Sequence, residues 1–214
     1  MLFLFNFKFG FIILKIRNKV ISMFLDSYAD SLASYISSKA EVNSDDKEKI
    51  NYSLKVILNE TFKIIILFSI FASIRKLDYF MFSFIILTSI RSFSGGIHFN
   101  TFTTCLSFTI LFFLTTCVFF THLPKINLFF SLIIIIFTIT IIIVKSPKPS
   151  ENRPIKNKER KCYLKLISLF ITIVWLNILF FYIKDIHYFN CGLGTIFIQA
   201  IQLLKKGSNN EKSI

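Results

Sequence analysis

Long, largely apolar runs separated by short charged connections are the feature that most constrains how this chain can fold. A helix needs about 20 apolar residues to cross the roughly 30 Å hydrocarbon core of a bilayer. Six runs approach that length: Leu54 to Ile74, Tyr79 to Ile90, Phe102 to Phe120, Leu128 to Val144, Leu164 to Ile183 and Tyr188 to Leu204. They predict an all-α, polytopic membrane protein with about six transmembrane helices.

The composition excludes several other classes of protein. Of the 214 residues 54% are apolar and 17% are charged, whereas a soluble domain carries roughly 25% charge. The four cysteines form no CxxC pair and no disulfide-dense pattern, which excludes a disulfide-stapled secreted protein and a zinc ribbon. One His beside one Cys leaves a metal site short of ligands, so we expect no metal and no other cofactor. A nucleic-acid partner is not expected either.

The basic residues predict the orientation in the membrane. Lys and Arg number 25 against 12 Asp and Glu, a net charge of +13. Most connections carry few of them, but the one between the fourth and fifth runs holds Lys145, Lys148, Arg153, Lys156, Lys158, Arg160, Lys161 and Lys165. Because short loops rich in Lys and Arg stay in the cytoplasm, this loop is predicted to be cytoplasmic. Counting crossings places both termini and the connection from Arg91 to Asn100 on the same side.

The ends of the chain flank one predicted membrane domain, residues 23–206. Residues 1–22 form an N-terminal extension, and one hypothesis is that synthesis begins at Met23 and the extension is a start-site artefact. Met23 to Ser38 has the apolar periodicity of an amphipathic helix, which predicts a helix lying in the membrane interface. Residues 207–214 are predicted to form a polar cytoplasmic tail.

The connection between the second and third runs gathers the groups that could do chemistry. Within the fifteen residues from Arg91 to Cys105 lie Gly95, Gly96 and His98. The two glycines allow backbone conformations closed to other residues and a close approach of another chain. A His and a Cys in one loop are the components of an activated thiol nucleophile, although such a pair is more often structural than catalytic.

The seven-residue spacing of His98 and Cys105 constrains the backbone between them. On a straight helix they would lie about 10 Å apart along the axis, too far for proton transfer, so the chain must turn. Asn100 to Thr104 is rich in N-cap and turn formers. We therefore expect Cys105 near the N-terminus of the third span, where the helix dipole and an imidazolium favour the thiolate.

Ionisable residues within the first span are a second candidate site. Glu60 and Lys63 are three residues apart and can pair on one helix face. Ionisable groups in spans are functional candidates by default, and the sequence does not say whether these two act in function. For Lys55, interfacial snorkelling is an equally good explanation.

The segment from Arg91 to Cys105, with its Arg, Gly-x-His and six-residue gap to Cys, resembles the catalytic segment of the accessory gene regulator protein B (AgrB) family. Weaker matches follow in order: the amphipathic start, Tyr52-Ser-Leu54, the basic loop Pro147 to Ile155, and Gly194 to Leu204. The resemblance covers Met23 to about Lys206. Two departures are the residues before Met23 and Gln199, where many members carry an acidic residue.

The resemblance implies a membrane cysteine endopeptidase of the bacterial plasma membrane that processes quorum-sensing peptides. Cys105 would be the nucleophile and His98 its general base. The substrate would be an AgrD-like precursor peptide, cleaved before its acidic C-terminal tail and then closed into a thiolactone ring. Arg91, Gly95 and Gly96 match motif positions, and physical reasoning suggests that they contact the substrate.

The basic loop gains a candidate role from this substrate. Five of its residues could hold the acidic tail: Arg153, Lys156, Lys158, Arg160 and Lys161. An equally good explanation is that they serve only to set the topology and to contact anionic lipid.

Two other functions stay open at this point. One is a small transporter or exporter of peptide signals without protease activity, although the chain shows no internal repeat of the transporter kind. The other is a non-catalytic membrane scaffold. Besides the precursor peptide and the lipid bilayer, a second copy of the chain in a homodimer is an open partner.

Overall fold

The computed structural model describes residues 27–39, 43–97, 101–124, 126–148 and 157–204. The chain divides into two compact units. The first, here called the N-terminal unit, comprises Met1–Ile70 and Phe99–Phe108. The second, here called the bundle unit, comprises Phe71–His98 and Thr109–Ile214. His98, the proposed start at Met23 and the tail 207–214 lie outside the described residues.

The described residues are helical apart from short connections and one isolated backbone bridge. A first helix covers residues 27–39. It is followed by α2 (Ser44–Ser73), α3 (Leu77–Ser94), α4 (Phe102–Leu114), the π-helical turn η1 (Thr115–Phe119), α5 (Phe120–His122), α6 (Leu128–Lys145), α7 (Lys158–Phe181) and α8 (Ile186–Leu204). Each of the six apolar runs thus lies largely within a helix, which confirms the predicted all-helical class.

Four stretches are long and apolar enough to cross a membrane: Asp45–Ser73, Phe102–His122, Leu128–Lys145 and Lys158–Phe181. The helices α3 and α8 are not among these four. Most of α8 is buried, including the polar side chains of Asn190, Gln199 and Gln202. The structure therefore supports a multi-pass membrane protein, whereas six full crossings remain a prediction.

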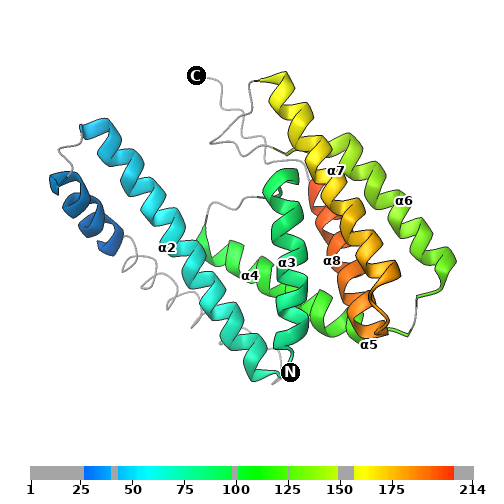
Figure 1. The fold of residues 1–214 in the computed structure, drawn as a ribbon. Helices are drawn as coiled ribbons and strands as arrows, with labels where there is room; N and C mark the ends of the chain where they lie inside the picture. The colour runs from blue at the N-terminus through cyan, green and yellow to red at the C-terminus, as the bar shows by residue number, and fades with distance from the viewer. Residues whose placement is uncertain (1–26, 40–42, 98–100, 125, 149–156, 205–214) are drawn as a thin grey trace, which may run out of the picture. The chain divides into compact units, whose positions relative to one another are not determined.

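The core of the bundle unit forms around α8, which contacts α3, α5, η1, α6 and α7 (Figure 1). An apolar cluster joins α3, α7 and α8 through Ile86, Ile90, Leu176, Leu179, Leu193 and Ile196. Polar bonds add to this packing, because Trp175 on α7 donates to Ser89 of α3 at 2.7 Å. Ser83 of α3 and Thr195 of α8 are 2.7 Å apart. These contacts hold α3, the helix that leads to Gly95, in a fixed position within the unit.

In the N-terminal unit the helix over residues 27–39 is joined to α2 by polar contacts. Asp30 accepts from Lys55 at 2.9 Å and from Asn51 at 2.6 Å. The buried residues of this helix are small ones: Ala29, Ala33 and Ser37. The larger Tyr28, Tyr35 and Ile36 are exposed. An apolar outer face suits a helix in the membrane interface, and this role remains a prediction.

Candidate functional site

Gly95 ends α3 in a conformation that favours glycine. Its φ of +73° lies in the left-handed region, and its N–H donates to the carbonyl of Arg91 at 2.9 Å. Lys148 lies directly beside it: its N–H donates to the Ser94 carbonyl at 2.9 Å. A Cβ on Gly95 would come within 2.2 Å of the Lys148 carbonyl oxygen. The close backbone approach expected at this glycine therefore occurs within the chain itself, to the residue that begins the basic loop.

Two polar side chains of the bundle unit, Gln199 and Arg91, bond to the backbone around Gly95. The buried Gln199 on α8 donates to the Gly95 carbonyl at 2.9 Å and to the Ser94 hydroxyl at 3.2 Å. Arg91 donates to the Ile97 carbonyl at 2.8 Å and to the Gln202 side chain at 3.4 Å. Gly96 is buried, and a Cβ there would lie 3.1 Å from the Arg91 guanidinium. Arg91 therefore holds the peptide that directly precedes His98, and its role in contacting substrate remains a prediction.

Cys105 lies in the first turn of α4, as the Thr- and Asn-rich stretch before it predicts. The Thr101 carbonyl accepts from the Cys105 N–H at 3.1 Å. The Thr101 hydroxyl accepts from the Thr104 N–H at 3.4 Å and lies 2.6 Å from the Thr104 hydroxyl, so Thr101 caps the helix. The thiol forms no disulfide, and its residue is partly exposed. A thiol at a helix N-terminus lies where the helix dipole favours the thiolate.

The first predicted span supplies a neighbour of Cys105 that the spacing of residues in the sequence does not reveal. Nζ of Lys63, on α2, lies 3.4 Å from Sγ of Cys105 and donates to it. The same ammonium lies 2.5 Å from a carboxylate oxygen of Glu60, so the predicted pair of Glu60 and Lys63 forms. All three residues belong to the N-terminal unit. This unit therefore brings a cation against the predicted nucleophile.

The remaining predicted site residues are only partly described. His98, Arg153 and Lys156 lie outside the described residues, and their predicted roles are untested. Lys158, Arg160 and Lys161 lie in the first turn of α7, exposed on its surface. Asn157 caps this helix by accepting from the N–H groups of residues 159 and 160. The three cations are thus free to meet a partner in solution or at a membrane surface.

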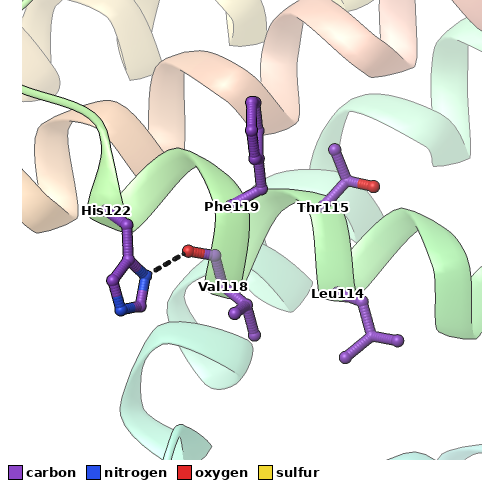
Figure 2. A pocket seen from close by; sticks show the side chains of 5 residues that line it. All are labelled: Leu114, Thr115, Val118, Phe119 and His122. Atoms are coloured by element: carbon purple, nitrogen blue, oxygen red, sulfur yellow. Dashed lines mark hydrogen bonds between the residues drawn. The ribbon is translucent and has the colours of Figure 1, made fainter.

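The other two histidines bond to backbone carbonyls, and one of them lines a hollow. A shallow hollow of about 740 Å³ is lined by Leu114, Thr115, Val118, Phe119 and His122 (Figure 2). Nδ1 of His122 donates to the Val118 carbonyl at 2.6 Å. His187 makes a similar bond to the Thr121 carbonyl at 2.7 Å. Both imidazoles therefore have structural partners, and none of the predicted site residues lines the hollow.

Two contributors to the site could be located only from the structure. The sequence marks Lys63 as an ionisable residue in an apolar run, which is a signal of function, but it does not name Cys105 as the partner. The contact of Lys148 with Gly95 joins two loops that are far apart in the sequence. In the described part of the chain, no group of three His, Cys, Asp or Glu side chains could hold a metal ion.

Together the apolar helices and the capped, cation-paired cysteine describe a multi-pass helical membrane protein with a candidate thiol site. The family model for Accessory gene regulator B matches residues 29–203. A relative from Clostridium beijerinckii, described as an AgrB-like protein, is 38% identical over 163 residues, which are 76% of this chain and 79% of the relative. The chain belongs to the accessory gene regulator B family. No solved structure matches it.

Family membership carries a coarse functional statement. Proteins of this family take part in the accessory gene regulator system of quorum sensing, in which they are associated with the AgrD precursor.

Proposed function

We propose that this chain is a membrane-embedded cysteine endopeptidase that removes the C-terminal tail of an AgrD-like precursor and promotes closure of a thiolactone. One observation carries the proposal: Cys105 is a partly exposed thiol in the first turn of α4, with an ammonium 3.4 Å from its sulfur. Two features that stabilise a thiolate, a helix N-terminus and a cation, therefore meet at the one cysteine of the family-like segment.

The reaction proceeds by acyl transfer. His98 accepts the thiol proton, and Sγ of Cys105 attacks the carbonyl carbon of the peptide bond before the acidic tail. The carbon–nitrogen bond breaks, and the departing amine takes the proton from His98. The acyl thioester on Cys105 then exchanges with the precursor's own cysteine, which closes the ring and regenerates the thiol. Water must be kept away, because hydrolysis of the thioester would release a linear product.

The positions of the basic residues support recognition of the acidic tail. Lys158, Arg160 and Lys161 are exposed at the start of α7. Lys148, which begins the same loop, contacts the backbone of Gly95, three residues before His98. Charge-assisted contacts from these side chains would draw the tail toward the segment that carries the histidine. In this proposal the loop and the catalytic segment both face the cytoplasm.

Co-expression with the precursor peptide tests the activity. Cys105→Ala and His98→Ala should each abolish release of the tail, measured by mass spectrometry of the precursor. Cys162→Ala is the matched control, because Cys162 is an exposed free thiol outside the segment and its loss should leave tail release unchanged. If tail release persists in both Cys105→Ala and His98→Ala, the protein is no protease, and export of a signal or a scaffold role takes its place.

A charge-removal series tests recognition of the tail. Replacing Lys158, Arg160 and Lys161 together by Gln should raise the precursor concentration needed for half-maximal cleavage about tenfold, the loss of roughly 1.4 kcal/mol of ionic contact. The control replaces three exposed lysines of the N-terminal unit: Lys39, Lys47 and Lys49. Unchanged cleavage in the first triple variant, with normal membrane insertion, would leave the loop only its role in topology.

A further inference from the structure

The ammonium of Lys63 is held in a buried position against the thiol of Cys105. The Lys63 side chain is only 8% exposed, although it carries a charge in a helix long and apolar enough to span a membrane. Its Nζ lies 3.4 Å from Sγ of Cys105, 2.5 Å from the Glu60 carboxylate and 5.9 Å from the centre of the Phe102 ring. Burying a charged group is costly unless it is paired, so this placement calls for an explanation.

Glu60 anchors Lys63 without cancelling its effect on the sulfur. The Glu60 side chain is 61% exposed, so solvent screens its negative charge. The contact between the ammonium and the sulfur is on the buried side of the pair, where charges interact more strongly. Phe102, the first residue of α4, adds a ring to the same ammonium. Lys63 is therefore oriented toward the beginning of α4, where Cys105 lies.

We propose that Lys63 is a catalytic residue of the thiol site: its ammonium holds Cys105 in the thiolate form that attacks the substrate. This inference rests on the proposed function and assigns a role to a residue of the first span. No bond forms or breaks at Lys63. The thiol proton passes to His98, and the ammonium stabilises the negative charge that remains on sulfur. It also favours departure of the thiolate when the thioester is exchanged.

The other explanation is purely structural. In that case Lys63 and Glu60 only fasten α2 to α4 in the N-terminal unit, where Phe62 also packs on Phe102 with ring centres 6.5 Å apart. The two explanations differ in what happens to the sulfur. A structural tether would change protein stability, whereas an electrostatic partner sets the pH at which the thiol becomes reactive.

The reactive pH can be measured without the precursor. The full-length protein in lipid nanodiscs is treated with iodoacetamide between pH 5 and 10, and alkylation of the peptide that carries Cys105 is timed by mass spectrometry. The midpoint of the rate against pH reports the thiol-to-thiolate transition, whereas accessibility alters only the plateau. In the described residues, Lys63 of α2 faces this sulfur and is paired with Glu60, and the sequence of α4 holds no titratable side chain besides Cys105 itself. His98, the general base of the proposed function, lies outside the described residues.

Two variants should move the midpoint in opposite directions. Lys63→Met removes the charge at similar length, so the midpoint should rise by about one pH unit and the rate at pH 7 should fall about tenfold. Glu60→Gln keeps a hydrogen-bond acceptor for the ammonium but removes the opposing charge. Its midpoint should fall, by about half a unit. Lys63→Arg keeps the cation and should react within about threefold of the native rate at pH 7, a change of less than one kcal/mol.

Lys55→Met is the matched control, because it also removes a lysine from α2. Lys55 is paired with Asp30, so its removal should leave the midpoint unchanged. A native-like midpoint in Lys63→Met overturns the proposal. If that variant fails to insert in the membrane, Glu60→Gln decides, since a midpoint that rises or stays constant overturns it equally. A failure of the proposed function gives a different result. Cys105→Ala would then still release the tail, whereas the alkylation midpoints of the Lys63 and Glu60 variants would still shift as expected.

Discussion

The two ends of the segment from Arg91 to Cys105 are held by different kinds of interaction. At the first end, in the bundle unit, the backbone of Gly95 is held by the Gln199 amide and lies against the peptide of Lys148. At the second end, in the N-terminal unit, Cys105 lies in the first turn of a capped helix and beside the charged side chain of Lys63. Hydrogen bonds to the backbone dominate the first end, and electrostatic contacts dominate the second.

This difference suggests a division of labour within the segment. Close-packed backbone contacts have a single geometry and tolerate almost no added atom, which suits a loop that must place His98 reproducibly. A cation near a sulfur acts over several ångströms and tunes reactivity more than position. Substitutions at the first end should therefore cause steric clashes that strongly lower tail release. Substitutions at the second end should change the reaction rate of Cys105 by smaller, graded amounts.

Gly95→Ala should have the largest effect. The added methyl group would meet the Lys148 carbonyl at 2.2 Å, and a φ of +73° costs a residue with a side chain about 1–3 kcal/mol. Displacement of the peptide that leads to His98 should lower tail release about 100-fold, equivalent to roughly 2.7 kcal/mol. The measurement is initial rate of tail release at a fixed amount of inserted protein.

Ser92→Ala is the control for Gly95→Ala. Ser92 is exposed near the same end of α3, and its hydroxyl donates to the Thr88 carbonyl one turn earlier. Loss of this hydroxyl should leave the rate of tail release near the native value. Native activity in Gly95→Ala would show that the loop can move away from Lys148, and the proposed steric restriction at the first end would be wrong.

Gln199→Glu should have the second-largest effect, at nearly constant shape. The Gln199 amide donates to the Gly95 carbonyl and the Ser94 hydroxyl, whereas a carboxylate cannot donate to a carbonyl and would repel it. Loss of this buried bond costs about 1–3 kcal/mol, so tail release should fall about tenfold. Gln202→Glu is the paired control, since Gln202 accepts from Arg91 and a carboxylate would strengthen that contact.

Native activity in Gln199→Glu would bear on the residue that the family favours at this position. The family resemblance leads us to expect an acid at the position of Gln199 in many members, so native activity in Gln199→Glu would mean that the carboxylate finds another donor. Tail release that falls more in Gln202→Glu than in Gln199→Glu would contradict the hydrogen-bond directions at the first end.

Thr101→Val should have a smaller effect at the second end. It removes the hydroxyl that accepts from the Thr104 N–H, and an N-cap of this kind is worth about 0.5–2 kcal/mol. Fraying of the first turn of α4 should lower the alkylation rate of Cys105 at pH 7 about threefold, equivalent to roughly 0.65 kcal/mol. Thr103→Val, within the helix rather than at its cap, should leave that rate unchanged.

Features that depend on local sequence could be predicted for both ends. The apolar runs gave the helices because charged or turn-forming residues interrupt them, and Thr101 to Thr104 gave the start of α4 because such residues cap helices. The positive φ at Gly95 is likewise a local property of glycine. Local patterns therefore predict the end of α3 at Gly95 and the start of α4 just before Cys105, and a turn between His98 and Cys105 stays a prediction.

Long-range partners could not be predicted in the same way. Nothing in the local sequence says that Lys63 meets Cys105, 42 residues later, or that Lys148 lies against Gly95. Periodicity also fails to show which side of the helix 27–39 is buried. Its apolar Tyr28 and Ile36 are exposed while small residues are buried, because a membrane protein need not bury its large apolar side chains in its own core.

The exposed ion pair of the N-terminal unit should show the weakest effect, and a dependence on pH. Hydrogen bonds from Lys55 and then Asn51 hold the pKa of Asp30 below its ordinary value of 3.8. The carboxylate therefore stabilises the contact with α2 at every pH above about 4, and this contribution disappears as the pH falls through the lowered pKa. With spin labels at Ser34 and Ser53, the distribution of label-to-label distances should become slightly broader when the pH is lowered below about 4.

Asp30→Asn separates this ion pair from the other acid-sensitive groups of the unit. The amide keeps the size of the side chain but does not titrate in this range, so the label distance should lose its dependence on pH near 4. The pair is exposed and screened by solvent, which is why its removal should leave the alkylation midpoint of Cys105 unchanged. If Asp30→Asn shifted that midpoint as Lys63→Met does, the reactivity of Cys105 would depend on the charge of the whole unit. The distinction drawn between a buried cation at the sulfur and surface ion pairs elsewhere on α2 would then fail.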